Sequence, residues 1–536
     1  MKKLSIFTIC ALGLASAALT SCSKQSDEIT SYTLNRNLSP IGMQAKNVQE
    51  STADIQWTPS ANATSYNLRV YAEDSMSYLF DDYDMVYEAT GLTEEDIPYT
   101  VKDLFFDTKY TVYIQAITDD NESRTSTWNG IYFRTSAKQF LKNPKPADIA
   151  DRSVTLTWEV EEGYDVSTIV IGDITYTITE EDKAAGKATV TGLEPETTYT
   201  AYLYYNGKQC GNRNFTTIAD LQGATIVHEG DDLADIIANA EANAVIAVFP
   251  GTYVMNENET GQAGAAKVNN SITIKGVYPT AQPVIKGRFE LYGGAALTIT
   301  QVVIDGKENA SGDQTFNYKD ATDYGALLVE NTEIKNFVKG ITYGNVVGTI
   351  ESITFSKCLI HDIQCDGGDF FDIRKNYVKT VTFEKSTIYN CAHTRDFIRY
   401  DDGSSSYSGA APVITVDQCT IDNVLNESNG KRLLYVRFAG NVINWTNNIV
   451  SNTKAVYTNQ SKTNTPTYTN NYYFGCSNAS IFAASDAETK VYWNGDVNAK
   501  NGADPMYKDA ANGDFTIGNE DVVKLNVGDP RWIVAQ

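Results

Sequence analysis

The chain has 536 residues, too many for one ordinary hydrophobic core, and its length predicts two to four domains. Acidic residues outnumber basic ones by 67 to 43, and the formal net charge of −24 argues against nucleic acid and anionic membrane surfaces as general partners. A hydrophobic fraction of 42% indicates a globular chain, and 33 tyrosines with recurrent Asn-, Thr- and Gly-rich runs favour β-structure with many turns.

The N-terminus has the pattern of an export signal. Lys2 and Lys3 precede an apolar run that ends in the sequence LTSC at residues 19–22. LTSC resembles the bacterial lipoprotein box, and the polar SKQSDE that follows resembles the surface-export tag of lipoproteins from Gram-negative glycan-degrading bacteria. The resemblance implies a signal peptide over residues 1–21, a lipidated Cys22 and a flexible tether over 22–35. It also implies a cell-surface position on the outer membrane, and the alternative is an ordinary cleaved signal.

Two segments, residues 36–136 and 143–217, repeat one design. Each contains short runs that alternate apolar and polar residues, separated by turns, with a tryptophan on an early strand. The run LEPETTY at residues 193–199 resembles the fibronectin type III pattern that leads into the tyrosine corner, and the same spacing precedes Tyr110 without the proline. The resemblance covers both segments and implies two β-sandwich modules, which we expect to act as spacers.

The remaining residues, 218–536, contain an internal repeat of 23 to 33 residues, which is typical of a solenoid. Each repeat has an apolar anchor residue and a second apolar residue five positions later. The anchors are Ile299, Val329, Phe355, Phe383, Val416, Trp445 and Tyr468. Insertions between constant apolar positions are tolerated as loops in such folds.

A polar residue stands seven positions after most anchors. This column contains Asn336, Asp362, Asn390, Asn423 and Asn452, with Gly306 and Gly475 at its two ends. It resembles the asparagine ladder of right-handed parallel β-helices, because these residue types tolerate a left-handed backbone at a tight turn. The region resembles pectin-lyase-like β-helix proteins. With the sandwich modules it is similar to an uncharacterised group of bacterial surface lipoproteins found beside glycan-uptake machinery. The expected fold class is therefore all-β, with two fibronectin type III-like sandwiches followed by a right-handed parallel β-helix.

Both ends of the predicted solenoid have sequences that can close it. Asp231 or Asp232 can cap a short amphipathic helix before the first coil. The segments 504–517 and 528–532 leave the repeat and are expected to cap the other end.

The repeat also argues against a disulfide. Cys358 and Cys419 share one column two coils apart, about 10 Å at the usual strand spacing, whereas a disulfide spans at most about 7 Å. We expect small buried thiols in this column.

Three apolar runs, FFDIR, DFIRY and LLYVR, each contain an arginine directly after Ile or Val. The repeat predicts that Arg374, Arg399 and Arg437 point outward in one column of neighbouring coils. Guanidinium groups about 5 Å apart repel each other by about 3 kcal/mol at an effective dielectric constant near 20, so the column requires anionic partners. One interpretation is internal pairing with acidic residues nearby in the sequence: Asp372, Asp396, Asp401, Asp402 and Glu427.

The other interpretation is a groove that binds a polyanionic chain, most simply a uronate-rich polysaccharide, because a guanidinium can engage both oxygens of a carboxylate. Tyr400, Tyr435 and His393 flank the predicted column and can stack on sugar rings. Acidic residues such as Asp372 can orient the arginines. The expected function is capture of an extracellular polysaccharide, with outer-membrane glycan-uptake proteins as potential partners and no nucleic acid.

Two further functions remain open. A polysaccharide lyase would use Arg399 or Arg437 as the base that abstracts a proton, whereas an adhesin or structural protein needs no arginine column. A hydrolase would need paired carboxylates, such as Asp396 with Asp401 or Asp402. We expect no cofactor or metal; the alternative is Ca²⁺ at Asp366, Asp369 and Asp372, in a stretch whose DGGD sequence is also typical of a turn.

Overall fold

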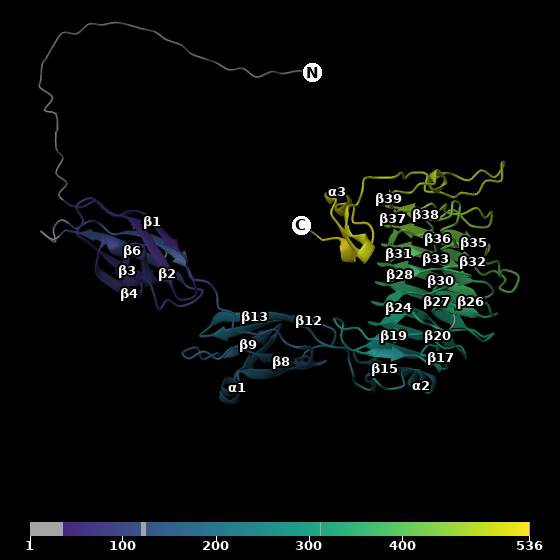
Figure 1. Cartoon of the computed structure of the whole chain (residues 1–536), viewed down its shortest axis with the longest axis horizontal. Helices are drawn as coiled ribbons and strands as arrows, with labels where there is room; N and C mark the ends of the chain where they lie inside the picture. The colour runs from purple at the N-terminus through teal and green to yellow at the C-terminus, as the bar shows by residue number, and fades with distance from the viewer. Residues whose placement is uncertain (1–35, 75, 119–124, 311, 535–536) are drawn as a thin grey trace, which may run out of the picture. The chain divides into compact units, whose positions relative to one another are not determined.

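The computed structural model describes residues 36–74, 76–118, 125–310 and 312–534 (Figure 1). The predicted signal peptide, Cys22 and the tether lie outside these residues. The described chain is all-β with very few helices. None of the helices in these ranges is long and apolar enough to cross a membrane.

The first module is a sandwich of two antiparallel sheets around the buried Trp57. One sheet contains β1 (Ile41–Lys46), β2 (Ala53–Thr58) and β5 (Tyr99–Val101). The other contains β4 (Met85–Leu92), β3 (Ser65–Ala72), β6 (Lys109–Ile117) and β7 (Asn129–Arg134). The predicted tyrosine corner is present, because the hydroxyl of Tyr110 accepts a hydrogen bond from the Phe105 amide at 2.6 Å.

The second module has the same kind of core, with Trp158 buried. Its smaller sheet pairs β8 (Ser153–Thr157) with β11 (Lys187–Thr191). Its larger sheet contains β10 (Ile174–Thr177), β9 (Thr168–Ile171), β12 (Thr198–Tyr205) and β13 (Lys208–Thr216). A short helix, α1 (Glu180–Ala185), precedes β11. Tyr199 forms the second predicted corner by accepting a hydrogen bond from the Glu194 amide at 3.0 Å.

From Thr225 onward the chain winds into coils whose strands stack in three parallel sheets (Figure 1). The ten-stranded sheet is built from β14 (Thr225–Val227), β15 (Ala244–Val248), β18 (Ile272–Gly276), β21 (Leu297–Thr300), β24 (Leu327–Glu330), β27 (Thr349–Ser356), β30 (Tyr377–Glu384), β33 (Val413–Asp417), β36 (Val442–Thr446) and β38 (Thr467–Thr469). The nine-stranded sheet is built from β16 (Thr252–Val254), β19 (Val284–Lys286), β22 (Val303–Asp305), β25 (Glu333–Lys335), β28 (Leu359–Ile363), β31 (Thr387–Cys391), β34 (Thr420–Asp422), β37 (Ile449–Ser451) and β39 (Tyr472–Phe474).

The seven-stranded sheet is built from β17 (Ala265–Val268), β20 (Arg288–Leu291), β23 (Phe316–Tyr318), β26 (Thr342–Gly344), β29 (Phe371–Ile373), β32 (Ile398–Tyr400) and β35 (Leu434–Val436). The predicted anchors form one register in the ten-stranded sheet, where each anchor from Ile299 to Tyr468 pairs with the next. The second apolar column forms one register in the nine-stranded sheet. Both predicted columns point into a single continuous core.

The ladder lies at the turn after the nine-stranded sheet, as predicted. Its Asn and Asp residues have φ values between 52° and 61°, in the left-handed region. Side chains of neighbouring coils are hydrogen-bonded to each other. Asn336 donates to Asp305 at 2.9 Å, Asn423 donates to Asn390 at 3.2 Å, and Asn390 donates to Asp362 of the preceding coil. Gly306 departs from the column because its φ is not positive; an added Cβ there would lie 2.7 Å from the Phe337 ring.

A second left-handed column was not predicted. It lies two residues after each anchor, at the turn between the ten-stranded and nine-stranded sheets, and its φ values range from 47° to 58°. Its members are Gln301, Asn331, Lys357, Lys385, Gln418, Asn447 and Asn470. Lysine and glutamine are not typical of this backbone region, so residue identity alone gave no signal.

The cysteine column is confirmed. Cys358, Ser386 and Cys419 stack in successive coils, and the Ser386 hydroxyl accepts a hydrogen bond from the Cys358 amide at 3.0 Å. Both cysteines are buried free thiols.

Helix α2 (Leu233–Ala238) closes the first end of the core. Its N-cap is Asp232, whose side chain accepts a hydrogen bond from the Asp235 amide at 3.0 Å, and Leu233 and Ile237 are buried in the core. At the other end the segment 479–503 covers the last coil, beginning with the short helix η5 (Ala479–Phe482) and its buried Ile481.

The prediction that segments 504–517 and 528–532 cap that end is wrong. They form β40 (Tyr507–Asp509), β41 (Asp514–Ile517), α3 (Glu520–Val523) and the short helix η7 (Pro530–Trp532). These elements pack along the outer face of the nine-stranded sheet, beside β31 and β37 (Figure 1). Ile517, Val522 and Val527 cover Ile449 there, because that side chain points away from the main core.

Candidate functional site

The three predicted arginines lie on the outer face of the seven-stranded sheet, but they do not form one column. Arg399 on β32 pairs in register with Asp372 on β29 and with Tyr435 on β35. Arg374 lies two residues after Asp372, and Arg437 lies two residues after Tyr435. At the equivalent position of the coil between them, two residues after Arg399, stands Asp401. A shift of two residues preserves the alternation of inward and outward side chains, so the apolar pattern could not reveal it.

The corrected register alternates the charges. One outward column runs Asp372, Arg399, Tyr435, and the next runs Arg374, Asp401, Arg437. The guanidinium groups therefore do not stack directly on one another, and the aspartates offset the repulsion that Arg399 still exerts on Arg374. Internal pairing accounts for the arrangement of these charges.

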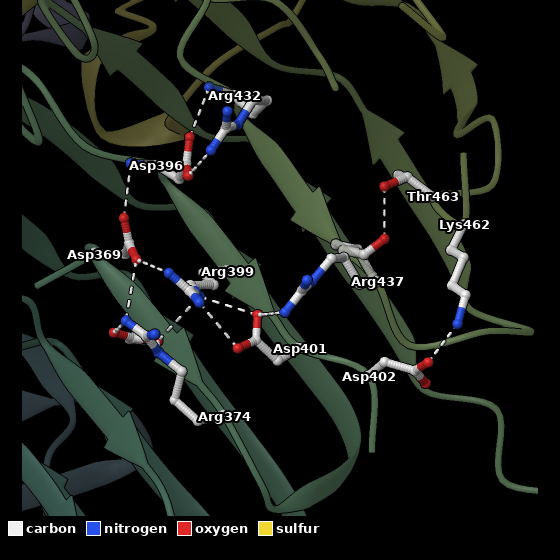
Figure 2. A network of polar contacts seen from close by, with 12 residues as sticks. Asp369, Arg374, Asp396, Arg399, Asp401, Asp402, Arg432, Arg437, Lys462 and Thr463 are labelled. Atoms are coloured by element: carbon white, nitrogen blue, oxygen red, sulfur yellow. Dashed lines mark hydrogen bonds and ion pairs between the residues drawn. The ribbon is translucent and has the colours of Figure 1, made fainter. Parts of the chain in front are cut away.

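Two bidentate ion pairs form the centre of the network (Figure 2). Arg374 donates from Nε and from Nη2 to the two carboxylate oxygens of Asp372, the second bond measuring 2.7 Å. Arg399 donates from Nε and Nη2 to the two oxygens of Asp401, each at 3.0 Å. Asp369 joins the pairs, with its Oδ2 lying 3.2 Å from Arg399 Nη1 and 3.5 Å from Arg374 Nη2.

The network continues into the neighbouring coil. Arg437 Nη2 lies 3.1 Å from Asp401 Oδ1, and Arg432 binds Asp396 through its Nη2 and, at 3.0 Å, through its backbone amide. The Asp396 amide in turn donates to Asp369 at 3.0 Å, so the whole set is continuous (Figure 2). We call the eight residues the arginine network: Asp369, Asp372, Arg374, Asp396, Arg399, Asp401, Arg432 and Arg437.

The acids of the network are more deeply buried than the arginines. The side chains of Asp369, Asp372 and Asp396 are 4%, 1% and 4% exposed, whereas Arg374 and Arg437 are 29% and 38% exposed. Burial raises the pKa of Asp372, and the hydrogen bonds from Arg374 oppose that rise. The same hydrogen bonds raise the pKa of Arg374.

The environment of Arg399 determines whether this residue can act as the base predicted for a lyase. Burial lowers the pKa of its guanidinium, but the hydrogen bonds and charge of Asp401, with Asp369 and Asp372, raise it above the ordinary value. A general base must release its proton readily, and this guanidinium holds its proton more tightly than a free arginine does. The geometry therefore does not favour Arg399 as the base of an elimination reaction.

The three aromatic candidates lie in three different environments. Tyr400 points into the core, where its hydroxyl contacts the backbone of Val378, so the prediction that it flanks a groove is wrong. It points inward because it lies two residues after the inward Ile398, and it pairs in register with Ile373. Tyr435 lies among three guanidinium groups, with the carbon of Arg432 at 4.5 Å from the ring centre and those of Arg399 and Arg437 at 5.3 and 5.2 Å. His393 lies at the ladder turn, outside the network, and its Nδ1 is 2.6 Å from the Asn426 amide oxygen.

The remaining acidic candidates are dispersed. Asp402 binds Lys462 and Ser404 at the edge of the sheet, Asp366 is exposed in a loop, and Glu427 is exposed. Asp396 and Asp401 each bind arginine, which does not leave them as a free acid and base pair. Within residues 36–534, apart from the gaps given above, no cluster of three or more His, Cys, Asp or Glu side chains could hold a metal ion.

Arg432 was missed from the sequence, although a signal was present. It stands directly before the buried pair Leu433 and Leu434 that opens LLYVR, as Asp369 stands before Phe370 and Asp396 before Phe397. A polar residue before a pair of inward residues recurs in three coils, and aligning on that pair would have given the correct register.

Comparison with known proteins places three family models on the chain. A fibronectin type III domain matches residues 38–128, and two domains of unknown function, DUF4957 and DUF5123, match residues 251–391 and 414–532. Arg374 falls in the first of these two, Arg437 in the second, and Arg399 between them. These domains fit a surface or structural protein.

No curated protein matches the chain. A two-domain fibronectin type III segment of chicken tenascin is 16% identical, covers 33% of this chain and 99% of its own, and has a TM-score of 0.24. The fibronectin type III domain of human collagen alpha-1(XX) is 22% identical, covers 20% of this chain and 94% of its own, and has a TM-score of 0.16.

Proposed function

We propose that this protein is lipid-anchored at the outer surface of a bacterium and captures an extracellular, uronate-rich polysaccharide along the outer face of the seven-stranded sheet. The observation that carries the proposal is a set of arginines held rigidly by buried aspartates while two of them, Arg374 and Arg437, remain partly exposed. The lipoprotein box at residues 19–22 supports the anchor.

Arg437 is the strongest candidate for direct contact with a ligand. It makes one ion pair, from Nη2 to Asp401 at 3.1 Å, and its Nε is buried without a hydrogen-bond partner among the described residues. A guanidinium has five N–H groups in a planar fork, so the N–H groups at the exposed end that Asp401 does not engage can bind a carboxylate. Because Asp401 and the Tyr435 ring already fix its position, binding a ligand orders little additional side chain.

The network also limits what kind of ligand fits. Its four aspartates and four arginines cancel in charge, so it does not attract polyanions by a net positive field. Recognition must come from the geometry of the free donors, which favours carboxylates spaced along a linear chain over a densely charged polyanion. We expect only moderate weakening of binding by salt.

The test is retention of purified protein beginning at Ser23 on a panel of uronate-rich and neutral polysaccharides. The variant Arg437→Ala should weaken binding of uronate-rich chains by tenfold or more, because a charge-assisted hydrogen bond contributes about 1.5–3 kcal/mol. The matched control is Arg69→Ala in the first sandwich. Arg69 is 37% exposed, binds one carboxylate oxygen of Glu88 and lies over the Trp128 ring.

Each other outcome has a distinct meaning. Unchanged uronate binding in Arg437→Ala would contradict the proposal, and so would an equal loss in Arg69→Ala. Absence of retention on every glycan would support an adhesive or structural role. Unsaturated products that absorb ultraviolet light would show a lyase.

A further inference from the structure

Two clefts lie side by side along the asparagine ladder, on a different turn of the coil from the arginine network. The first has a volume of about 500 Å³ and is lined by Asn309, Asn336, Gln364 and His393. The second has a volume of about 390 Å³. Both include Asp362 and Asn390, so together they form one continuous polar channel, which we call the ladder groove.

The side-chain amide of Asn309, in the first cleft, has no hydrogen-bond partner in the described part of the protein. Neither its Nδ2 nor its Oδ1 has a hydrogen-bond partner among the described residues, and both atoms are shielded from solvent. Its backbone amide is bonded to Gly306, so the residue is held in place. A shielded amide without partners costs free energy, and in native proteins such a group calls for a partner that the chain itself does not supply.

The ladder itself is interrupted inside the same cleft. Asn390 donates to Asp362, but Asp362 is a carboxylate and has no N–H to pass on to Asn336. Asn336 donates in the other direction, to Asp305, so its amide oxygen accepts no hydrogen bond among the described residues. Both carboxylate oxygens of Asp362 are already engaged, by Asn390 and His361, so the Asn336 amide oxygen is left as the acceptor without a donor among the described residues here.

His393 adds one more acceptor. Its Nδ1 lies 2.6 Å from the Asn426 amide oxygen, and that oxygen can only accept, so Nδ1 carries the proton. The Nε2 atom of the neutral ring is then an acceptor at the edge of the groove. Among the side chains that line the two clefts, Lys307 offsets Glu308, and Asp362 and Asp422 leave the groove negative.

These features select one class of ligand. An anion would be repelled by Asp362, and an apolar molecule would leave the lining polar groups unpaired. A sugar hydroxyl is both a donor and an acceptor, so adjacent hydroxyls can bond the Asn309 amide together with the Asn336 oxygen and His393 Nε2. We propose that the ladder groove binds a neutral oligosaccharide segment, independently of the arginine network.

The test uses the purified protein from Ser23 onward with neutral hexaoses of glucose, xylose and mannose, measured by calorimetry and by ligand-detected NMR. At least one should bind, and Asn309→Ala and Gln364→Ala should each weaken it. Removing both hydrogen bonds of the Asn309 amide should reduce affinity about tenfold. The melting temperature of Asn309→Ala without ligand should stay unchanged or rise, because the free amide has no partner to lose.

The exposed Gln222, outside the groove, provides the control Gln222→Ala, which should bind as the unmodified protein does. Absence of binding by every neutral hexaose would overturn the proposal. Equal binding by the unmodified protein and Asn309→Ala would do the same, as would a lower melting temperature of Asn309→Ala with unchanged affinity. Since Arg437 lies outside the groove, Arg437→Ala should leave hexaose binding intact, which separates failure of this site from failure of the arginine site.

Discussion

Individual side chains in this protein are placed by partners in the neighbouring coil. His361 on β28 is an example: its Nε2 lies 2.9 Å from Glu333 Oε1 in the preceding coil, and its Nδ1 lies 2.7 Å from Asp362 Oδ2. Its ring stacks on Tyr389 of the following coil, with ring centres 4.8 Å apart. Because both ring nitrogens contact carboxylates, the protonated imidazolium, which donates from both, is the form that fits this site.

The pH dependence of this contact follows from its charges. Burial lowers the pKa of His361, but the hydrogen bonds with Glu333 and Asp362 raise it above the ordinary value of 6.5. A raised pKa in the folded state stabilises the fold fully below 6.5, and this contribution is lost as the pH rises through the folded-state value. The hydrogen bond from His361 also lowers the pKa of Glu333 from 4.5 to about 2, so that contribution is lost as the pH falls from 4.5 towards 2.

We therefore predict that His361→Gln lowers the melting temperature most near pH 5.5 and least above the folded-state pKa of His361. At pH 5.5 the loss should correspond to about 1.5–3 kcal/mol, the value of a hydrogen bond to a charged group. The control is His228→Gln, at an exposed position. Melting curves of the three proteins between pH 5 and pH 9 provide the measurement, and a pH-independent difference for His361→Gln would contradict the prediction.

At the scale of the element, each coil contains two turns in which one residue has a left-handed backbone conformation. Only one of these turns could be predicted from the sequence. The ladder turn was predicted because Asn and Asp are typical of that backbone. The turn two residues after the anchor uses residues as different as Lys357 and Gln418 at positive φ, and it recurs because the coil geometry requires it. The strands themselves were predictable, since the inward residues recur at fixed offsets from each anchor.

The register of the seven-stranded sheet was harder to predict for a physical reason. Moving DFIRY by two residues against FFDIR keeps an apolar residue at every inward position, so core packing alone accepts both registers. What distinguishes them is the position of Asp401 between Arg374 and Arg437, where it forms an ion pair with Arg437, a contact between coils that no single strand reveals.

We predict that Asn390→Leu destabilises the β-helix by about 2–4 kcal/mol, because it removes two inter-coil hydrogen bonds and places a branched side chain at a φ of 52°. Asn390→Gly should cost less, since glycine accepts this φ. Chemical unfolding provides the measurement, with the exposed Asn498→Leu as control. Equal losses for the leucine and glycine variants would mean that backbone strain plays no part.

At the scale of the whole molecule, the chain joins two sandwich modules to a β-helix that carries both candidate sites. The predicted lipid at Cys22 would place all of these at a membrane surface. The position of residues 504–534 could not be predicted. Their apolar residues indicate that this segment is buried against another part of the chain. The surface that it covers is marked by the outward-pointing Ile449, which is distant in the sequence.

We predict that Cys22→Ala moves the protein from the membrane fraction to the soluble fraction while the melting temperature of the soluble domains stays unchanged. The lipoprotein hypothesis attaches the chain to the membrane through Cys22, and the substitution removes the thiol that would carry the lipid. Fractionation of cells that express each protein provides the measurement. Retention of Cys22→Ala in the membrane fraction would contradict the lipoprotein prediction.

The C-terminal segment also sets an order of events during biosynthesis. A ribosome releases the coils of β28 to β37 before it makes residues 504–534, which cover the outer face of those coils through Ile517, Val522 and Trp532. Until the final residues emerge, the nascent solenoid exposes Ile449 and the unpaired hydroxyl of Thr387. Premature termination near the end of the gene would leave a nearly full-length chain with an exposed apolar surface around Ile449. Such a chain would be prone to associate with other unfinished chains.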